Sequence, residues 1–495
     1  MGQDRNNLRQ TGGLPLAVIA IVGTAILIAL APPESRDLVA YGCVCIVIVV
    51  AMMLRVAKVV GALSAAPVLG FLPWLAVTWP ATVIYFAVAS PDATYLTSLG
   101  PVPFLLRAEV LLFAVLLFLG GYGAGIAPVL LGHQRQTPAL PRADEIDVEW
   151  WLIVVAAIAI TMDCAVAVAN IHGTVRFIAN GLHSYLTGMV FLAGYRWRTL
   201  SRSQRLLVVL TLSSSGIVYT VANSRGTAVL PLAVVVFGYV VSPGTTRRAR
   251  VILLTSVLVA LPIYTVVGNQ TRIKLGSIGF RDFDQRAEVL ADALSGNIIY
   301  QDGGFLEDTM GRLYSVGGHA LLVANWDRMK IQEFDLAQFG IEFAEAMLPT
   351  YLVGSKDFDS YRYVGHQVLR NYGFLITEET SVEVTLIGSL CAAGGPLLVA
   401  LGGLVLGLFH LLLIRVTDQF RLRAWTVPFA GCLFATGMFV HTIDIIQLVR
   451  TYLWAILYTG IVIQVCMFLA HKVFSVRPTK GLTVVSISPA ARDLR

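Results

Sequence analysis

The chain has 495 residues, of which 56% are hydrophobic and only 13% are charged, and its formal net charge is +6. A soluble protein of this length could not hide so much apolar surface, so the composition excludes a soluble globular domain and predicts a polytopic membrane protein. The basic excess follows from how Lys and Arg are distributed between loops, and no basic run interleaved with aromatic residues indicates a nucleic-acid partner.

Apolar runs long enough to cross a bilayer, about 20 residues each, recur along the chain. They cover residues 14–31, 38–54, 61–89, 108–131, 150–170, 183–195, 206–222, 227–243, 251–267, 383–414, 425–443 and 451–471. Backbone groups in lipid must be satisfied within their own segment, so each run is expected to be a helix. The sequence predicts an all-α bundle of about twelve spans, with nine in residues 1–267, three in residues 383–471 and a tail over residues 472–495.

One polar segment of 115 residues, Gly268 to Val382, interrupts these runs. It holds 10 of the 36 Lys and Arg residues and more than half of the 30 Asp and Glu residues. Within it, Asp282–Tyr300 and Glu307–Lys330 have the periodicity of amphipathic helices. The apolar face of the first consists of Val289, Leu290, Ala293 and Leu294. A large, mostly helical loop is therefore expected over residues 268–382.

The distribution of basic residues predicts the orientation of the chain. With the N-terminus inside, the inner loops and tails hold 21 Lys and Arg residues, the short outer loops hold 5, and the long segment holds the remaining 10. Long loops are translocated largely regardless of their charge. Both termini are expected on the cytoplasmic side and the long segment on the outer side.

Patterns of several common chemistries are missing from the sequence. It has no GxxxxGK[ST] phosphate-binding loop and no HExxH zinc pattern, and all six cysteines fall within predicted spans. No metal and no cofactor are expected. The inner loops are too short for a nucleotide-sugar domain, so the sequence favours a lipid-linked, already activated donor that is reached from the membrane or from outside.

Ionisable residues near the outer ends of the predicted spans are informative, because burying them in a membrane is expensive. Asp163 and Arg225 are two of these residues. Arg225 follows Ala222-Asn223-Ser224 in a very short outer turn, and its rigid guanidinium suits phosphate oxygens. A role in topology, or a side chain that reaches to the lipid headgroups, remains the alternative.

The long segment supplies further candidates. Its cations could hold phosphate groups together with Arg225: Arg272, Lys274, Arg312, Arg362 and Arg370. Its titratable residues and the acid that enters the next span could take a proton from a sugar hydroxyl: His319, His366 and Glu383. Tyr361 to Arg370 is the densest cluster of such groups in the chain.

Three local patterns resemble those of the Wzy-type O-antigen and exopolysaccharide repeat-unit polymerases, which are relatives of the O-antigen ligases. Asn223-Ser224-Arg225-Gly226-Thr227 is similar to the "SRG" outer turn of that family. Gly340 to Lys356, with Pro349 after an apolar stretch, is similar to its loop pattern. Gly388 to Gly395 occupies the place of its Gly-Glu pattern, with Ser389 in place of the Glu.

This resemblance implies a multi-pass protein of the bacterial cytoplasmic (inner) membrane whose active site faces the periplasm or exterior. It implies a metal-independent, inverting glycosyltransferase for cell-envelope polysaccharide, with undecaprenyl pyrophosphate carrying the growing glycan. The arginines would hold the pyrophosphate, and a His or Glu would take the acceptor proton. The implied partners are the lipid-linked oligosaccharide, membrane lipids, a chain-length regulator and a flippase.

Three other functions stay open at this point, and one of them is a scaffold for envelope assembly that has no catalytic activity. An O-antigen ligase would move the glycan to a different acceptor with the same chemistry. A transporter of polysaccharide or lipid-linked sugar should instead place polar residues along the bilayer midplane and show repeat symmetry. The sequence concentrates its ionisable residues at the outer ends of the spans, which favours the enzyme.

Overall fold

The structure is a computed structural model. It describes residues 13–97, 100–132, 146–169, 171, 174–221, 225–253, 255–256, 270, 283–299, 341, 344, 386–419, 423–439 and 445–473.

Helices make up almost all of this part of the chain. They are α2 (Gly13–Leu30), α3 (Arg36–Val60), α4 (Ala66–Ala76), α5 (Thr82–Ala89), α6 (Ala108–Gly125), α7 (Ala127–Leu130), α8 (Ile146–Val168), α9 (Thr174–Leu186), α10 (Phe191–Tyr195), α11 (Arg202–Val221), α12 (Arg225–Val241), α14 (Phe283–Leu294), α20 (Leu386–Gln419), α21 (Arg423–Phe439) and α22 (Ile445–Val473). The short helices η1 (Pro33–Ser35), η2 (Val77–Ala81) and η4 (Thr187–Val190) connect some of them. In the described ranges, seven helical stretches are long and apolar enough to cross a membrane. The prediction of a helical membrane protein is confirmed to that extent.

A short β-hairpin is the exception to the all-α prediction. Strand β1 (Thr94–Thr97) pairs antiparallel with β2 (Gly100–Pro103), from Thr94 opposite Pro103 to Thr97 opposite Gly100. The hairpin joins α5 to α6, and the Phe104 ring stacks on Phe86 with centroids 4.4 Å apart. This aromatic contact fixes the base of the hairpin to the end of α5.

The span predicted at residues 183–195 is longer than expected. Its helix begins at Thr174 and continues through η4 and α10 to Tyr195. The first half was missed because polar residues such as Arg176 and Asn180 lower its mean hydropathy below that of an ordinary span. A helix crowded with polar side chains must place them against protein rather than lipid.

Helices α6 and α20 pack with their backbones almost in contact. A Cβ atom at Gly121 would collide with the Ala400 carbonyl oxygen, and one at Gly403 would collide with the Phe118 carbonyl oxygen. Gly407 approaches the carbonyl oxygen of Tyr122 in the same way. In a membrane, where lipid is as apolar as a leucine side chain, such close contact between small residues is a main source of helix association.

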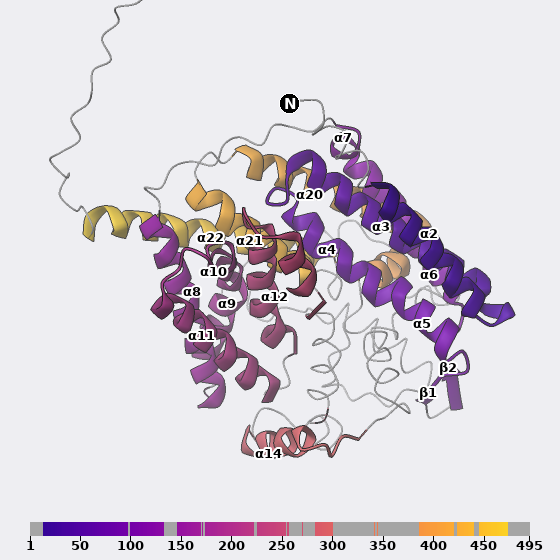
Figure 1. The fold of residues 1–495 in the computed structure, drawn as a ribbon, viewed down its shortest axis with the longest axis horizontal. Helices are drawn as coiled ribbons and strands as arrows, with labels where there is room; N and C mark the ends of the chain where they lie inside the picture. Colours follow the sequence, from indigo (N-terminus) through magenta and orange to yellow (C-terminus); the bar gives the residue numbers. More distant parts are fainter. Residues whose placement is uncertain are drawn as a thin grey trace, which may run out of the picture.

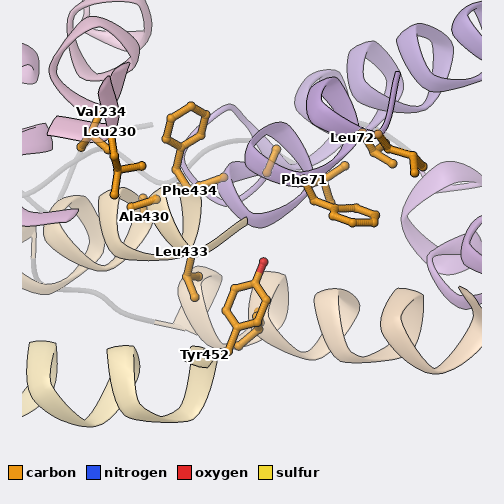
Figure 2. Packing of buried hydrophobic residues seen from close by; sticks show 14 of the residues in the cluster. Phe71, Leu72, Leu230, Val234, Ala430, Leu433, Phe434 and Tyr452 are labelled. Atoms are coloured by element: carbon orange, nitrogen blue, oxygen red, sulfur yellow. The ribbon is translucent and has the colours of Figure 1, made fainter. Parts of the chain in front are cut away.

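Helix α21 lies at the centre of the bundle. It contacts α4, η4, α10 and α12. Figure 2 shows labelled side chains of α4 and α12 on either side of it. Phe434 of α21 stacks on Phe237 of α12 with ring centroids 3.8 Å apart. In Figure 1, α20, α21 and α22 thus connect the group α2–α6 with the group α8–α12.

Helix α20 is broken near its start. Gly394 and Gly395 leave the helical conformation, and Pro396 follows them. Gly395 has φ 64° and ψ −153°, a backbone conformation that is open essentially to glycine alone. The eight residues before the break therefore form a separate helical segment of about two turns, which overlaps the stretch that resembles the Gly-Glu pattern.

The described helix of the long polar segment is α14, which confirms the amphipathic helix expected there. Leu290 and Ala293 are buried as predicted, but Leu294, at the last helical position, is exposed. Helix α14 contacts α11, and it lies with the β-hairpin below the bundle in Figure 1, whereas α7 lies at the top. Nearby, the buried Gln270 side chain accepts a hydrogen bond from the Ile299 N–H at 2.9 Å and donates to the Ile299 carbonyl at 3.0 Å. This pair joins residues on either side of α14.

The contact between α6 and α20 gives a stability prediction with a matched control. Gly121→Ala should lower the free energy of unfolding by about 1–3 kcal/mol, because the new methyl group meets a backbone carbonyl that cannot move aside. Gly120→Ala, at a neighbouring position with no atom within 4 Å, should leave stability unchanged or raise it by up to about 1 kcal/mol through helix propensity. Thermal unfolding of both variants in detergent measures the difference, and equal melting temperatures would contradict the packing described.

Candidate functional site

A buried carboxylate near the end of α8 forms the centre of a polar cluster inside the bundle. Asp163 is 4% exposed and lies five residues before the helix ends at Val168. His183 of α9 and Tyr219 of α11 are also buried and meet it there. Ionisable residues within apolar helices are expensive, and where they occur they commonly mark a site of function.

The hydrogen bonds of the cluster converge on one oxygen atom. His183 Nδ1 lies 2.8 Å from Asp163 Oδ2 and 3.1 Å from the Tyr219 hydroxyl. The Tyr219 hydroxyl donates to the same Asp163 Oδ2. Three helices are thus tied together through a single carboxylate.

The carboxylate beside His183 favours one arrangement of its ring protons. A carboxylate in its ionised form only accepts hydrogen bonds, and Nδ1 is then the donor. In the neutral imidazole, Nε2 then carries a lone pair, and no hydrogen bond to Nε2 is formed by any residue in the described part of the chain. A carboxylate that orients an imidazole and leaves its other nitrogen basic is the arrangement of a general base.

Local sequence explains how the cluster is positioned. Asp163 and Tyr219 lie near the ends of α8 and α11, and α9 and α12 begin close to those ends along the chain. One turn after His183, the Thr187 hydroxyl donates to the His183 carbonyl at 2.6 Å, where α9 gives way to the tighter η4. Gly188 in η4 packs directly on Cys432 of α21, so this turn is held by the central helix.

A second buried histidine differs in having both nitrogens occupied. His410 of α20 has Nδ1 2.7 Å from the Tyr122 hydroxyl of α6 and Nε2 3.0 Å from the Tyr452 hydroxyl of α22. All three side chains are fully buried. Because both ring nitrogens of His410 are hydrogen-bonded, this side chain holds three helices together and has no ring nitrogen free to bind a ligand or accept a proton.

A buried ion pair joins α8 to the end of α10. Arg196 Nε donates to Glu149 Oε2 at 2.5 Å, and Glu149 is 2% exposed. Glu149 lies near the start of α8, more than three helical turns from Asp163 near its end. The pair therefore stabilises the opposite end of α8 from the polar cluster.

Of the site residues predicted from sequence, Arg225 falls within the described backbone and is the first residue of α12. Tyr219 precedes it by six positions, so Arg225 and the Asp163–His183–Tyr219 cluster belong to neighbouring helix ends. The other predicted residues lie outside the described residues: Arg272, Lys274, Arg312, His319, Arg362, His366, Arg370 and Glu383.

No group of three His, Cys, Asp or Glu side chains able to hold a metal ion occurs among the residues that the structure describes. All six cysteines are buried and free, and each lies in a helix, as the sequence predicts. Asp163, His183 and Tyr219 have the donors and acceptors of a proton-handling cluster.

Comparison with family models, with curated proteins and with solved structures gives no match for this chain.

The sequence alone pointed to Asp163 but not to its partners. His183 and Tyr219 are 20 and 56 residues away from Asp163, and hydrophobic periodicity shows which face a residue occupies but not what it meets. The available signal was the polar character of residues 174–185 directly before an apolar run, because such a helix has to be shielded from lipid.

The brace around His410 gives a testable contrast in stability. Tyr452→Phe should lower the free energy of unfolding by about 1–3 kcal/mol, because it removes the hydroxyl and leaves His410 Nε2 buried without a partner. Tyr41→Phe, at a position that is 51% exposed on α3, should have little effect. Thermal unfolding of the detergent-solubilised variants provides the measurement. If Tyr452→Phe unfolded at the same temperature as the wild type, the hydrogen bond between Tyr452 and His410 would contribute nothing to stability.

Proposed function

We propose that the chain is a glycosyltransferase of the bacterial cytoplasmic membrane. It would polymerise oligosaccharide repeat units linked to undecaprenyl pyrophosphate on the outer face, without a metal ion. The proposal includes about twelve spans, both termini inside, and residues 268–382 as an outer loop over the active site.

The observation that carries this proposal is the gathering of ionisable groups at one end of neighbouring helices. The Asp163–His183–Tyr219 cluster links the end of α8 to the end of α11, and Arg225 begins α12 after a three-residue connection. The first N–H groups of a helix carry partial positive charge. An arginine adds a full positive charge to the first residue of α12, and both arginine and a helix N-terminus favour a phosphate group.

The arrangement of the connecting segments supports the proposed orientation. Helix α6 runs from the β-hairpin to α7, and these lie at opposite ends of the molecule in Figure 1. Helix α14 lies on the same side as the hairpin. Charge counting assigns both connections to the outer side, in agreement with one continuous outer face.

The proposed reaction requires charge stabilisation more than any other contribution. The acceptor hydroxyl attacks the anomeric carbon of the donor from the face opposite its pyrophosphate, and the bond to pyrophosphate breaks. Arg225 would neutralise the leaving group, joined by cations of the long segment: Arg272, Lys274, Arg312, Arg362 and Arg370. A titratable group must accept the proton of the hydroxyl, and the candidates named from sequence are His319, His366 and Glu383.

The proposal is tested with purified protein in liposomes. Lipid-linked oligosaccharide is extracted from cells that lack the gene, added to the liposomes, and the product is separated by length. A ladder of products is expected for a polymerase. A single transfer to a different acceptor would replace the polymerase by a ligase, and movement of the lipid-linked sugar across the bilayer without a new bond would replace it by a transporter.

Arg225→Ala should lower the rate of chain growth by about 10²–10³-fold, the range for removal of one group that stabilises developing charge. Arg225→Lys should retain part of the rate, because it keeps the charge but loses the two-pronged geometry. The matched control is Arg202→Ala, an exposed arginine at the start of α11, which should leave the rate unchanged. Unaltered chain growth in Arg225→Ala would remove Arg225 from the site.

A further inference from the structure

The hydrogen bonds of the Asp163–His183–Tyr219 cluster use one ring nitrogen of His183, Nδ1, and leave the other, Nε2, outside the cluster. His183 is 1% exposed, and its Nε2 accepts no hydrogen bond from a residue within the described ranges. Nε2 is therefore the atom of the cluster that remains available to a ligand.

Ser215 provides a second, independent observation. It is completely buried in α11, and its hydroxyl has no hydrogen-bond partner in the described part of the structure. Ser215 lies four positions before Tyr219, so the two side chains share one face of α11. That face already reaches Asp163 through Tyr219. The unsatisfied Ser215 hydroxyl and the His183 imidazole therefore belong to the same polar layer between α8, α9 and α11.

The two groups together define the chemistry of a ligand. His183 Nε2 requires a hydrogen-bond donor, and the Ser215 hydroxyl can donate to an acceptor. A sugar hydroxyl is both a donor and an acceptor, which is the chemistry that the two atoms require. A pyrophosphate that links a sugar to a lipid carries no proton near neutral pH and cannot donate to Nε2, so this layer fits the acceptor sugar and not the pyrophosphate.

We propose that His183 is the catalytic base that takes the proton of the acceptor hydroxyl, with Asp163 as the residue that positions it. This inference rests on the proposed function and makes it more specific. His183 Nε2 accepts the proton while the hydroxyl oxygen forms its bond to the anomeric carbon. The bond from that carbon to the pyrophosphate oxygen breaks, and its electron pair leaves with pyrophosphate. The proton passes from the imidazolium to the released pyrophosphate or to water.

The carboxylate gives Asp163 its role in this step. As the proton arrives, the imidazole becomes a cation inside an apolar bundle, and the adjacent carboxylate stabilises it. The Tyr219 hydroxyl donates to the same oxygen and holds Asp163 in place. His410 has no carboxylate beside it among its hydrogen-bond partners, and both of its nitrogens are occupied by tyrosines. The comparison explains why only one of these two buried histidines fits the role.

The test uses the liposome assay with wild-type protein and four variants. His183→Gln should lower kcat by about 10²–10⁴-fold, the usual contribution of general base catalysis. Asp163→Asn should lower kcat as well, and Asp163→Glu should restore part of it. Ser215→Ala should raise KM for the acceptor more than it lowers kcat. Binding of the lipid-linked donor, measured on the same preparations, should be unchanged in all four.

The control is His410→Gln, which should lower thermal stability but retain kcat. This result would show that replacing a buried histidine does not by itself inactivate the protein. Wild-type kcat in His183→Gln would overturn the inference while the proposed function stands, whereas a wild-type protein that forms no product would overturn the proposed function itself. If His183→Gln does not fold, ¹⁵N spectra of imidazole-labelled wild-type protein decide. A proton on Nδ1 with Nε2 basic supports the inference, and a proton on Nε2 overturns it.

Discussion

The close contact of α6 with α20 is the interaction on which the arrangement of the other helices depends. Gly121, Gly403 and Gly407 let the two backbones meet, and this contact brings Tyr122 to His410. His410 in turn binds Tyr452 and so fixes α22, which crosses α8 and α9. The polar cluster lies between α8, α9 and α11, so its geometry follows from a chain of contacts that begins at three glycines. Lipid supplies no hydrophobic force between helices, and small residues and shared hydrogen bonds therefore have to hold the bundle together.

The helices were predictable because a bilayer imposes a length and a composition on any segment that crosses it. This constraint acts on each segment separately, and runs such as those in α3, α8 and α22 could be recognised without knowledge of their neighbours. The helix that begins at Thr174 shows where the rule fails. His183 in this helix is shielded by other helices, and hydropathy averaged along the chain does not register shielding that comes from residues far away in sequence. The hairpin between α5 and α6 was missed for a related reason, because a ladder of four residues a side is too short to show a period.

The residues of the candidate site likewise fall into those that the sequence reveals and those that it does not. Asp163 and Arg225 were visible because a charged residue at the end of an apolar run stands out locally. His183, Tyr219 and Ser215 were not visible, since an imidazole or a hydroxyl in a helix has the same local pattern whether it braces the core or binds a ligand. What separates these roles is hydrogen-bond satisfaction, which depends on partners 20 to 56 residues away. The residues of the long polar segment were chosen by residue type and by resemblance, and these criteria carry no information about distance from the bundle.

The two buried histidines show how little a residue type determines its role. Each is held between helices, each contacts a tyrosine hydroxyl, and each is almost completely shielded from solvent. Around His410 the partners are neutral and both nitrogens are used, so protonation would place an uncompensated charge in an apolar core. Around His183 a carboxylate is already present and one nitrogen is left over, so a proton can arrive without creating net charge. The carboxylate is itself expensive to bury, and a brace made of histidine and tyrosine alone would hold three helices equally well. Its presence beside His183 is therefore better explained by the chemistry of a moving proton than by the packing of the bundle.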